Sequence, residues 1–160
     1  MLFTKIKKCR ISNDKSLIKI GKLGYFNLTG TFNKTKNNKD LKTPIELVFS
    51  NKSKLLQLAH NYDERKLFGT NYGYRSSLNK SMVSHLKEKK DLLIKTAKPK
   101  KNDSILDIGS NDGTLLNLFS NQFKKYGVDP TAKKFIKYYQ KDIKIIPKIF
   151  KKGIFNKSKK

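Results

Sequence analysis

The residues best placed to do chemistry lie in one short stretch of the chain, residues 103–130. An apolar run over Ser104–Ile108, typical of a buried parallel strand, is followed directly by a tight turn, Gly109–Gly113. An apolar-periodic segment then predicts a helix, and a second short strand ends at Asp129, twenty positions after the first glycine of the turn. This order is that of a βαβ nucleotide-binding unit, in which glycines let the backbone approach the ligand and the acid accepts ribose hydroxyls.

The turn does not follow the dinucleotide fingerprint, which requires glycines in the pattern G-x-G-x-x-G. Its spacing is instead Asp107-x-Gly109-x-Asn111-x-Gly113. This pattern resembles the first motif of class I S-adenosylmethionine-dependent methyltransferases, with Asn111 at the position of the middle glycine. A ligand without phosphate needs no pyrophosphate cradle, which agrees with the looser turn. A methyl donor is therefore the first interpretation, while another nucleotide or a purely structural turn remain open.

Further blocks in the same order and spacing extend this resemblance over roughly residues 5–150. They are Gln57-Leu58, Leu67-Phe68, Asn71–Ser77, Met82, His85, Asp107–Leu116 and Gly127–Pro130. Together they are similar to the sugar C-methyltransferase family, whose members methylate carbons of nucleotide-linked deoxysugars. The resemblance implies an α/β fold: a small mixed, zinc-ribbon-like domain followed by a Rossmann-like class I methyltransferase sheet. It also implies S-adenosylmethionine as the cofactor and a nucleotide-linked sugar as the substrate.

The same resemblance gives roles to individual residues. Asp107 and Gly109 would lie under the methionine part of the donor, and Asp129 would accept hydrogen bonds from the ribose hydroxyls. The full cofactor-binding set is Asp107, Gly109, Asn111, Gly113, Asp129, Ser76 and Ser77. Tyr72 and Tyr74 are the expected catalytic residues, since a tyrosine over the reacting centre can hold a sugar hydroxyl or assist proton transfer. Aromatic packing, turn capping and a plain strand–turn–helix remain alternatives for these residues.

The metal site departs from the family pattern, which uses two C-x-x-C pairs. The matching positions in this chain are Cys9, Ser12, Ser50 and Ser53. A serine hydroxyl stays protonated near neutral pH and is a poor zinc ligand compared with thiolate or imidazole. We therefore expect no zinc at this site, and we interpret Cys9 as an ordinary small side chain at a degenerate site.

Length is the second departure, because 160 residues supply only the first strands of a class I sheet. In the family, further catalytic histidine and acidic residues follow the part that this chain matches. We therefore expect a fragment, inactive alone, that a complementing polypeptide carrying the remaining strands would make soluble and active. A basic RNA-associated binding module on the same fold, or a nonfunctional gene remnant, are the alternative functions.

The pattern of apolar residues predicts four parts. The first, residues 1–60, is the zinc-domain-like part, with short strands at Leu17–Ile20 and Leu23–Phe26 and a hairpin from Ile45–Phe49 and Leu55–Leu58. A polar loop over residues 35–43 precedes the hairpin.

The second part, residues 61–100, holds a helical turn at 63–65, a tyrosine-rich loop at 68–77 and a helix over Ser81–Ala97. The third, 101–150, is the partial methyltransferase domain, with a second helix expected over Thr131–Gln140 and a third strand over Ile143–Ile149. The fourth, 151–160, is a basic tail.

The net charge of +25 comes from 37 Lys and Arg against 12 Asp and Glu. Proteins that read nucleic acids usually include Arg, whose planar fork grips phosphates and bases, yet only 3 of the 37 are Arg. The lysines are also scattered, so we predict a solvated basic surface without a nucleic-acid partner. The sequence shows neither an apolar run of membrane-spanning length nor the apolar core of a signal peptide, which predicts the cytoplasm and no membrane partner.

Overall fold

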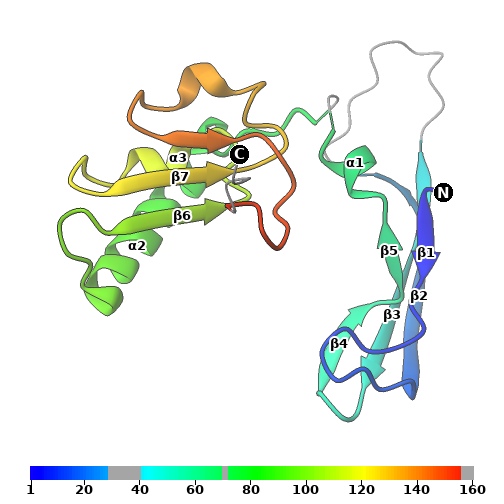
Figure 1. Ribbon diagram of the computed structural model, residues 1–160. Helices are drawn as coiled ribbons and strands as arrows, with labels where there is room; N and C mark the ends of the chain where they lie inside the picture. The colour runs from blue at the N-terminus through cyan, green and yellow to red at the C-terminus, as the bar shows by residue number, and fades with distance from the viewer. Residues whose placement is uncertain (29–40, 70–71, 156–160) are drawn as a thin grey trace. The chain divides into compact units, whose positions relative to one another are not determined.

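The computed structural model describes residues 1–28, 41–69 and 72–155 of the chain. Over those residues the protein is a mixed α/β structure with several sheets, one of which is parallel. The chain divides into two compact units, Met1–Gly73 and Tyr74–Lys160, and each is described by itself (Figure 1). This division falls within the predicted connecting segment 61–100.

The first unit is built mainly from antiparallel strands. Its elements are β1 (Phe3–Lys5), β2 (Leu17–Asn27), β3 (Lys42–Ser50), β4 (Leu55–Leu58), β5 (His60–Tyr62) and α1 (Glu64–Leu67). β1 pairs with β5, and β3 lies between β2 and β4. The predicted hairpin is confirmed as β3 and β4, and the predicted helical turn is confirmed as α1, which Asp63 caps by accepting the Arg65 amide at 3.0 Å.

β2 differs from the prediction of two short strands broken by glycines. It runs without interruption from Leu17 to Asn27, and its pairing with β3 shifts register between Lys19 and Gly21 and again between Lys22 and Gly24. The glycines therefore sit at bulges inside one strand, because a bulge absorbs a residue without ending the ladder.

The second unit contains the parallel sheet, with strand order β6-β7-β8. Its elements are η1 (Ser76–Leu78), α2 (Lys80–Ala97), β6 (Ser104–Ile108), α3 (Thr114–Asn117), β7 (Lys124–Val128), η2 (Ile136–Tyr138) and β8 (Lys144–Ile146). The first two predicted strands are confirmed as β6 and β7. The third is confirmed as β8, which ends directly before Pro147, a residue that cannot donate to a ladder. The buried core comprises Leu116, Ala132, Tyr139 and Ile143.

Two predicted helices in this unit are wrong in extent. α3 stops at Asn117, and its last turn tightens to bonds three residues apart, from the amides of Leu118 and Phe119. The expected helix over Thr131–Gln140 is instead a series of turns with the single 3-10 turn η2. Most of the apolar residues in these segments are buried, although Ile136 is 59% exposed, and most of the backbone hydrogen bonds are made at the shorter spacing.

The long helix α2 is confirmed, and its ends follow from local chemistry. The side chain of Asn79 accepts the Ser81 amide at 3.0 Å, which satisfies one of the unpaired donors of the first turn. At the other end Lys98 is left-handed, with φ 46°, and Pro99 follows. α2 packs on α3, which in turn lies against β6 and β7.

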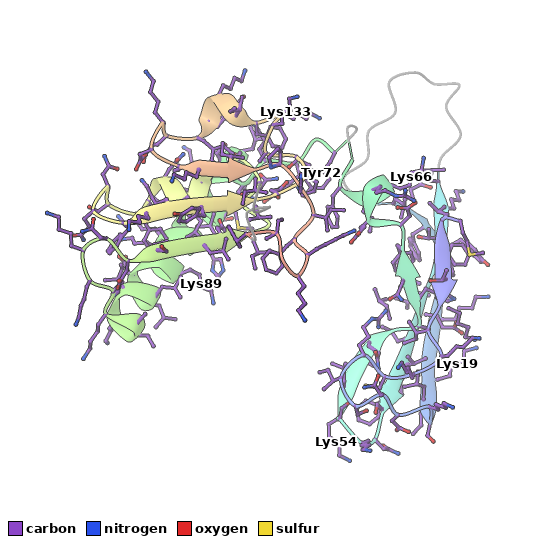
Figure 2. The ribbon with its side chains drawn as sticks, in the orientation of Figure 1. Lys19, Lys54, Lys66, Tyr72, Lys89 and Lys133 are labelled. Carbon is purple, nitrogen blue, oxygen red and sulfur yellow. The ribbon has the colours of Figure 1, made fainter. Side chains whose placement is uncertain are left out.

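Lysine side chains project from both units, as Lys19 and Lys54 of the first and Lys89 and Lys133 of the second illustrate (Figure 2). No helix among the described residues is long and apolar enough to cross a membrane. Most of the polar loop predicted at 35–43, part of the tyrosine-rich loop and the end of the basic tail lie outside the described residues.

Candidate functional site

The predicted glycine turn leaves the carboxyl end of β6, the edge at which parallel sheets bind their ligands. Gly109, Asn111 and Gly113 have φ angles of 81°, 49° and 76°, so every second residue of the turn is left-handed. Asparagine is one of the few other residues that visit this conformation, which explains how Asn111 can stand at a glycine position. The Gly109 amide closes the turn by donating to the Val128 carbonyl at 2.8 Å.

Tyr139 packs against the turn and forms hydrogen bonds with it. A Cβ atom on Gly113 would lie 2.6 Å from the Tyr139 ring, so this aromatic contact requires a glycine at the position. The Tyr139 hydroxyl donates to the Asn111 carbonyl at 2.8 Å and accepts from Ser110 at 2.8 Å. Burial raises the pKa of Tyr139 far above its usual value, so the hydroxyl stays protonated and can donate.

The side chain of Asn111 connects the turn to residues 74–77, a segment that includes the start of η1. Its Oδ1 accepts the Ser76 amide at 2.9 Å, and its Nδ2 donates to the Tyr74 carbonyl at 3.0 Å. A glycine would keep the turn but could not make these bonds. Asn111 therefore both shapes the turn and positions the backbone of Tyr74 and Ser76.

Asp112 makes a second connection to the same segment. One carboxylate oxygen accepts from the amide and hydroxyl of Ser77 at 3.1 and 2.6 Å, and the other accepts from the amide and hydroxyl of Thr114 at 3.3 and 2.5 Å. Burial acts to raise the pKa of Asp112, but these hydrogen bonds outweigh it and hold the pKa below its usual value. Asp112 is therefore a buried, charged carboxylate at the start of α3.

Asp129 directly follows β7, and hydrogen bonds from nearby residues occupy most of the acceptor positions of its carboxylate. Its Oδ2 accepts the Asn111 amide at 2.9 Å, and its Oδ1 accepts from the amide and hydroxyl of Thr131 at 2.6 and 2.5 Å. Each carboxylate oxygen has two acceptor positions, so Oδ1 is filled and Oδ2 keeps one. Asp129 can accept one ribose hydroxyl in this arrangement, not the pair that we expected.

Asp107 lies one strand away, near the carboxyl end of β6, and is half-buried. Its side chain accepts no hydrogen bond from the residues that the structure describes. Burial, and secondarily the charge of Asp129, raise the pKa of Asp107 to about 6. A carboxylate with this environment is destabilised in the folded protein and gains from any cation that approaches it.

The three carboxylates converge around the turn. Asp107, Asp112 and Asp129 all act on the Tyr139 hydroxyl, and each contributes to raising its pKa. In a chain with a net charge of +25, this edge of the sheet is therefore a local concentration of negative charge. Such a site attracts a cation and repels a phosphate.

The two predicted catalytic tyrosines fall in different units. Tyr74 belongs to the second unit, where its carbonyl is fixed by Asn111 and its side chain is 39% exposed. Tyr72 belongs to the first unit, where its ring lies against Phe68 with the ring centres 5.7 Å apart. Of the nine predicted site residues, Tyr72 is the one outside the second unit.

Sequence reasoning missed two residues of the site. Asp112 was not among the predicted site residues, because its partner Ser77 is 35 positions away and no local pattern joins them. Tyr139 fell within the helix expected over Thr131–Gln140 and was given no role at the turn. The glycine at position 113 was the only available sign of a bulky neighbour, and it did not identify which one.

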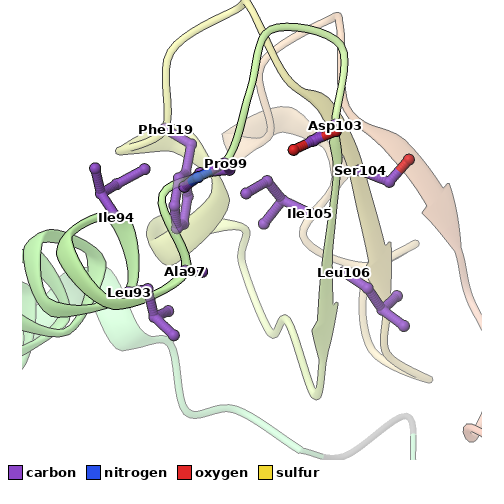
Figure 3. Close-up of a pocket in the computed structure, with 9 residues that line it drawn as sticks. All are labelled: Leu93, Ile94, Ala97, Pro99, Asp103, Ser104, Ile105, Leu106 and Phe119. Atoms are coloured by element: carbon purple, nitrogen blue, oxygen red, sulfur yellow. The ribbon is translucent and has the colours of Figure 1, made fainter.

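A cavity in the second unit lies away from the turn. It has a volume of about 540 Å³ and lies between the end of α2 and the amino-terminal half of β6, with Phe119 among its lining residues (Figure 3). Its lining is mostly apolar, including Leu93, Ile94 and Ile105. The glycine turn follows the opposite end of β6, so this groove is separate from the candidate site.

The four positions that match the family's metal ligands do come together in the first unit. Cys9 lies 3.1 Å from Ser53, and Ser12 lies 3.4 Å from Ser50, measured between the sulfur or oxygen atoms of their side chains. Within the described residues, no group of three or more His, Cys, Asp and Glu side chains is placed to hold a metal ion.

No protein-family model matches this chain, and no curated protein matches its sequence.

Proposed function

We propose that the second unit binds S-adenosylmethionine and serves as the donor-binding part of a methyltransferase. The observation that carries this proposal is Asp107: a half-buried carboxylate without a hydrogen-bond donor, beside a left-handed turn and near two further carboxylates. S-adenosylmethionine carries a sulfonium and an ammonium group, and either would supply the positive charge that Asp107 lacks. In this proposal the parallel sheet belongs to a Rossmann-like fold.

An anionic dinucleotide fits the same site poorly. Dinucleotide folds place the pyrophosphate at the amino terminus of a long helix, where unpaired amides and the helix dipole favour negative charge. Here α3 has only four residues, and the Asp112 carboxylate already accepts the first amide, that of Thr114. A phosphate would meet this carboxylate at short range.

Different residues of the chain would bind different parts of the donor. Asp107 would pair with a positive group, and the free acceptor position on Asp129 would take one ribose hydroxyl. Asn111 and Asp112 would keep the segment with Tyr74 and Ser76 docked beside the turn. Tyr74 is then the residue best placed to meet the acceptor, which the motif resemblance suggests is a nucleotide-linked sugar.

Titration calorimetry tests the choice of ligand. Wild-type protein should bind S-adenosylmethionine and should not bind the dinucleotide NAD⁺ measurably. Asp107→Asn should weaken donor affinity by about ten- to a hundredfold, as expected for the loss of one charge-assisted interaction of roughly 1.5–3 kcal/mol. The matched control Asp91→Asn, on the exposed face of α2, should leave the affinity unchanged. Equal binding of both nucleotides would refute the proposal.

The proposal includes a second polypeptide that supplies strands beside β6. β6 is the outer strand of its sheet, and its side chains Leu106 and Ile108 are 42% and 54% exposed. The apolar groove of Figure 3 adjoins the same strand, which supports further elements packing there. Methyl transfer from labelled donor to a nucleotide-linked keto-deoxysugar should rise when that polypeptide is added, and unchanged turnover would argue against this partner.

A further inference from the structure

The first unit contains two short corners with the same construction. One is Cys9–Ser12, between β1 and β2, and the other is Ser50–Ser53, which begins at the last residue of β3 and leads toward β4. Each has a small polar side chain at its first and fourth positions. Each is followed by a residue in the left-handed conformation, Asn13 and Lys54, both with φ 56°. The resemblance between the corners is therefore in the backbone as well as in the side chains.

The side chains of the two corners pair crosswise. The first residue of one corner meets the last of the other: Cys9 with Ser53 at 3.1 Å, and Ser12 with Ser50 at 3.4 Å. Cys9 and Ser50 are fully buried. Two i, i+3 pairs facing each other in this way have the arrangement by which structural metal sites collect four ligands.

Zinc does not fit this set of side chains. A structural zinc site uses four thiolate or imidazole ligands, and here three of the four groups are hydroxyls that stay protonated near neutral pH. The Cys9–Ser53 pair is also closer than two ligands of one zinc would be. A sulfur about 2.3 Å and an oxygen about 2.1 Å from a tetrahedral zinc lie roughly 3.6 Å from each other. The 3.1 Å separation between Cys9 and Ser53 is instead that of a hydrogen bond, and the Ser12–Ser50 contact at 3.4 Å is a longer, weaker one.

Arg10 adds to the connection between the first corner and the strands beyond it. Its guanidinium donates to the side chains of Gln57 and Asn61 at 3.1 and 2.8 Å and to the carbonyls of Leu58 and His60 at 2.7 and 3.0 Å. This uses the planar fork of one of only three arginines in the chain. A lysine could not make this set of bonds.

We infer that hydrogen bonds among Cys9, Ser12, Ser50 and Ser53 do the structural work of a metal ion between the two corners, and that the corners keep the geometry for four metal ligands. The first unit is therefore stable without metal. Replacing the three hydroxyls by thiols should create a tetrahedral zinc or cobalt site at this position. The inference concerns the first unit and does not depend on the proposed function of the second.

The decisive variant is the triple change Ser12→Cys, Ser50→Cys and Ser53→Cys in the full chain. Purified reduced and metal-free, it should bind one Co²⁺ per chain, with the visible absorption of tetrahedral cobalt thiolate. Its melting temperature should rise with added zinc, because a ligand that binds only the folded state stabilises it. The matched control adds three thiols at exposed serines outside the corners, Ser16→Cys, Ser84→Cys and Ser120→Cys, and should show neither effect.

Wild-type protein gives an independent test that does not rely on the triple variant folding. As purified it should hold no stoichiometric metal, and a strong chelator should leave its melting temperature unchanged. Ser53→Ala should lower the melting temperature more than Ser16→Ala, because Ser53 pairs with Cys9 whereas Ser16 lies exposed outside the corners. About one zinc per wild-type chain, with a fall in melting temperature on chelation, would overturn the inference. So would a folded triple variant that binds no more cobalt than its control.

Discussion

Asp107 has an environment that structural carboxylates usually avoid. It is half-buried, accepts no hydrogen bond from the described residues, and lies near the charge of Asp129. Buried polar groups without partners destabilise a fold, and they persist mainly where function requires them. Asp112, in contrast, receives four hydrogen bonds and is well satisfied. Asp112 therefore has the environment of a structural carboxylate, and Asp107 has the one that the proposed donor-binding role requires.

Asp107→Asn should stabilise the protein near pH 8 while it weakens donor binding. The pKa of Asp107 is raised from 3.8 to about 6, so the folded state holds the proton more tightly than the unfolded state. Stability from this group is therefore present below pH 4 and is lost as pH rises through about 6. After a discount for solvent screening, the gain on substitution is about 1 kcal/mol, or roughly 4–8 °C in melting temperature.

Thermal melts at about pH 8 and about pH 4 check the sign, since the difference between wild type and variant should shrink at the lower pH. Asp91→Asn, on an exposed helix face, is the control and should change little at either pH. A variant that is destabilised at high pH would mean that Asp107 has a structural partner.

Asn111 offers a second test at the level of one residue. Asn111→Gly keeps the left-handed turn but loses the bonds to Ser76 and Tyr74, so hydrogen exchange at the Ser76 amide should accelerate while the Gly109 amide stays protected. Asn111→Val should instead lower stability by about 1–2 kcal/mol or more, because a branched side chain is strained at positive φ. Equal exchange rates at Ser76 in wild type and Asn111→Gly would contradict the docking role.

At the scale of elements, the sequence predicted the strands and turns that depend only on residues close together in the chain. Two apolar runs separated by a turn predicted the hairpin of β3 and β4, and an apolar run followed by the glycine turn predicted β6. The docking of the Ser76–Ser77 segment on the turn could not be predicted, because it joins residues 35 positions apart. Helix length in the second unit also failed, since tertiary contacts of Phe119 and Tyr139 override a weak helical pattern.

We expected the lysines to form a solvated basic surface, and Lys125 does not follow this expectation. Its side chain is fully buried, and its ammonium donates to the Phe119 carbonyl, Asn121 and Gln140 and pairs with Asp142 at 2.9 Å. It thereby ties the segment after α3 to the approach to β8. Nothing in the sequence distinguishes it from the exposed Lys124.

Lys125→Met should therefore lower the free energy of unfolding by about 2–3 kcal/mol, since it leaves buried acceptors and a partly buried carboxylate without a donor. Lys124→Met is the matched control and should stay within about 0.5 kcal/mol of wild type. Chemical denaturation measures both. Equal effects of the two substitutions would show that the buried ammonium contributes nothing specific.

At the scale of the whole molecule, the positive charge is spread over both units, whereas part of the negative charge is concentrated at the glycine turn. Lysines project from both units (Figure 2), while three of the twelve acidic residues gather at the glycine turn. The basic surface gives general attraction to polyanions without a shaped site, and the turn gives specific attraction to a cation. Added salt should therefore weaken the binding of polyanions more than the binding of a cation at the turn.

RNA binding, where measured, should be weak, indifferent to sequence and lost steeply between about 50 and 200 mM salt, because it depends on counterion release by scattered lysines. Donor binding at the partly buried turn should change much less over the same range, because buried charges are screened less. Filter binding with two unrelated RNA sequences makes the comparison. Tight, salt-resistant binding to one of them would favour a nucleic-acid-binding function instead.

The most direct test of the account is the pKa of Asp107 itself, followed by the carboxyl carbon resonance in NMR with and without S-adenosylmethionine. In the free protein Asp107 should titrate at about 6. With donor bound, a nearby positive group stabilises the carboxylate, and the pKa should fall below its value in the free protein. Asp112 keeps its hydrogen bonds in both states and should not change. A donor that binds without lowering the pKa of Asp107, or that does not bind at all, would contradict the assignment of this turn as the donor site.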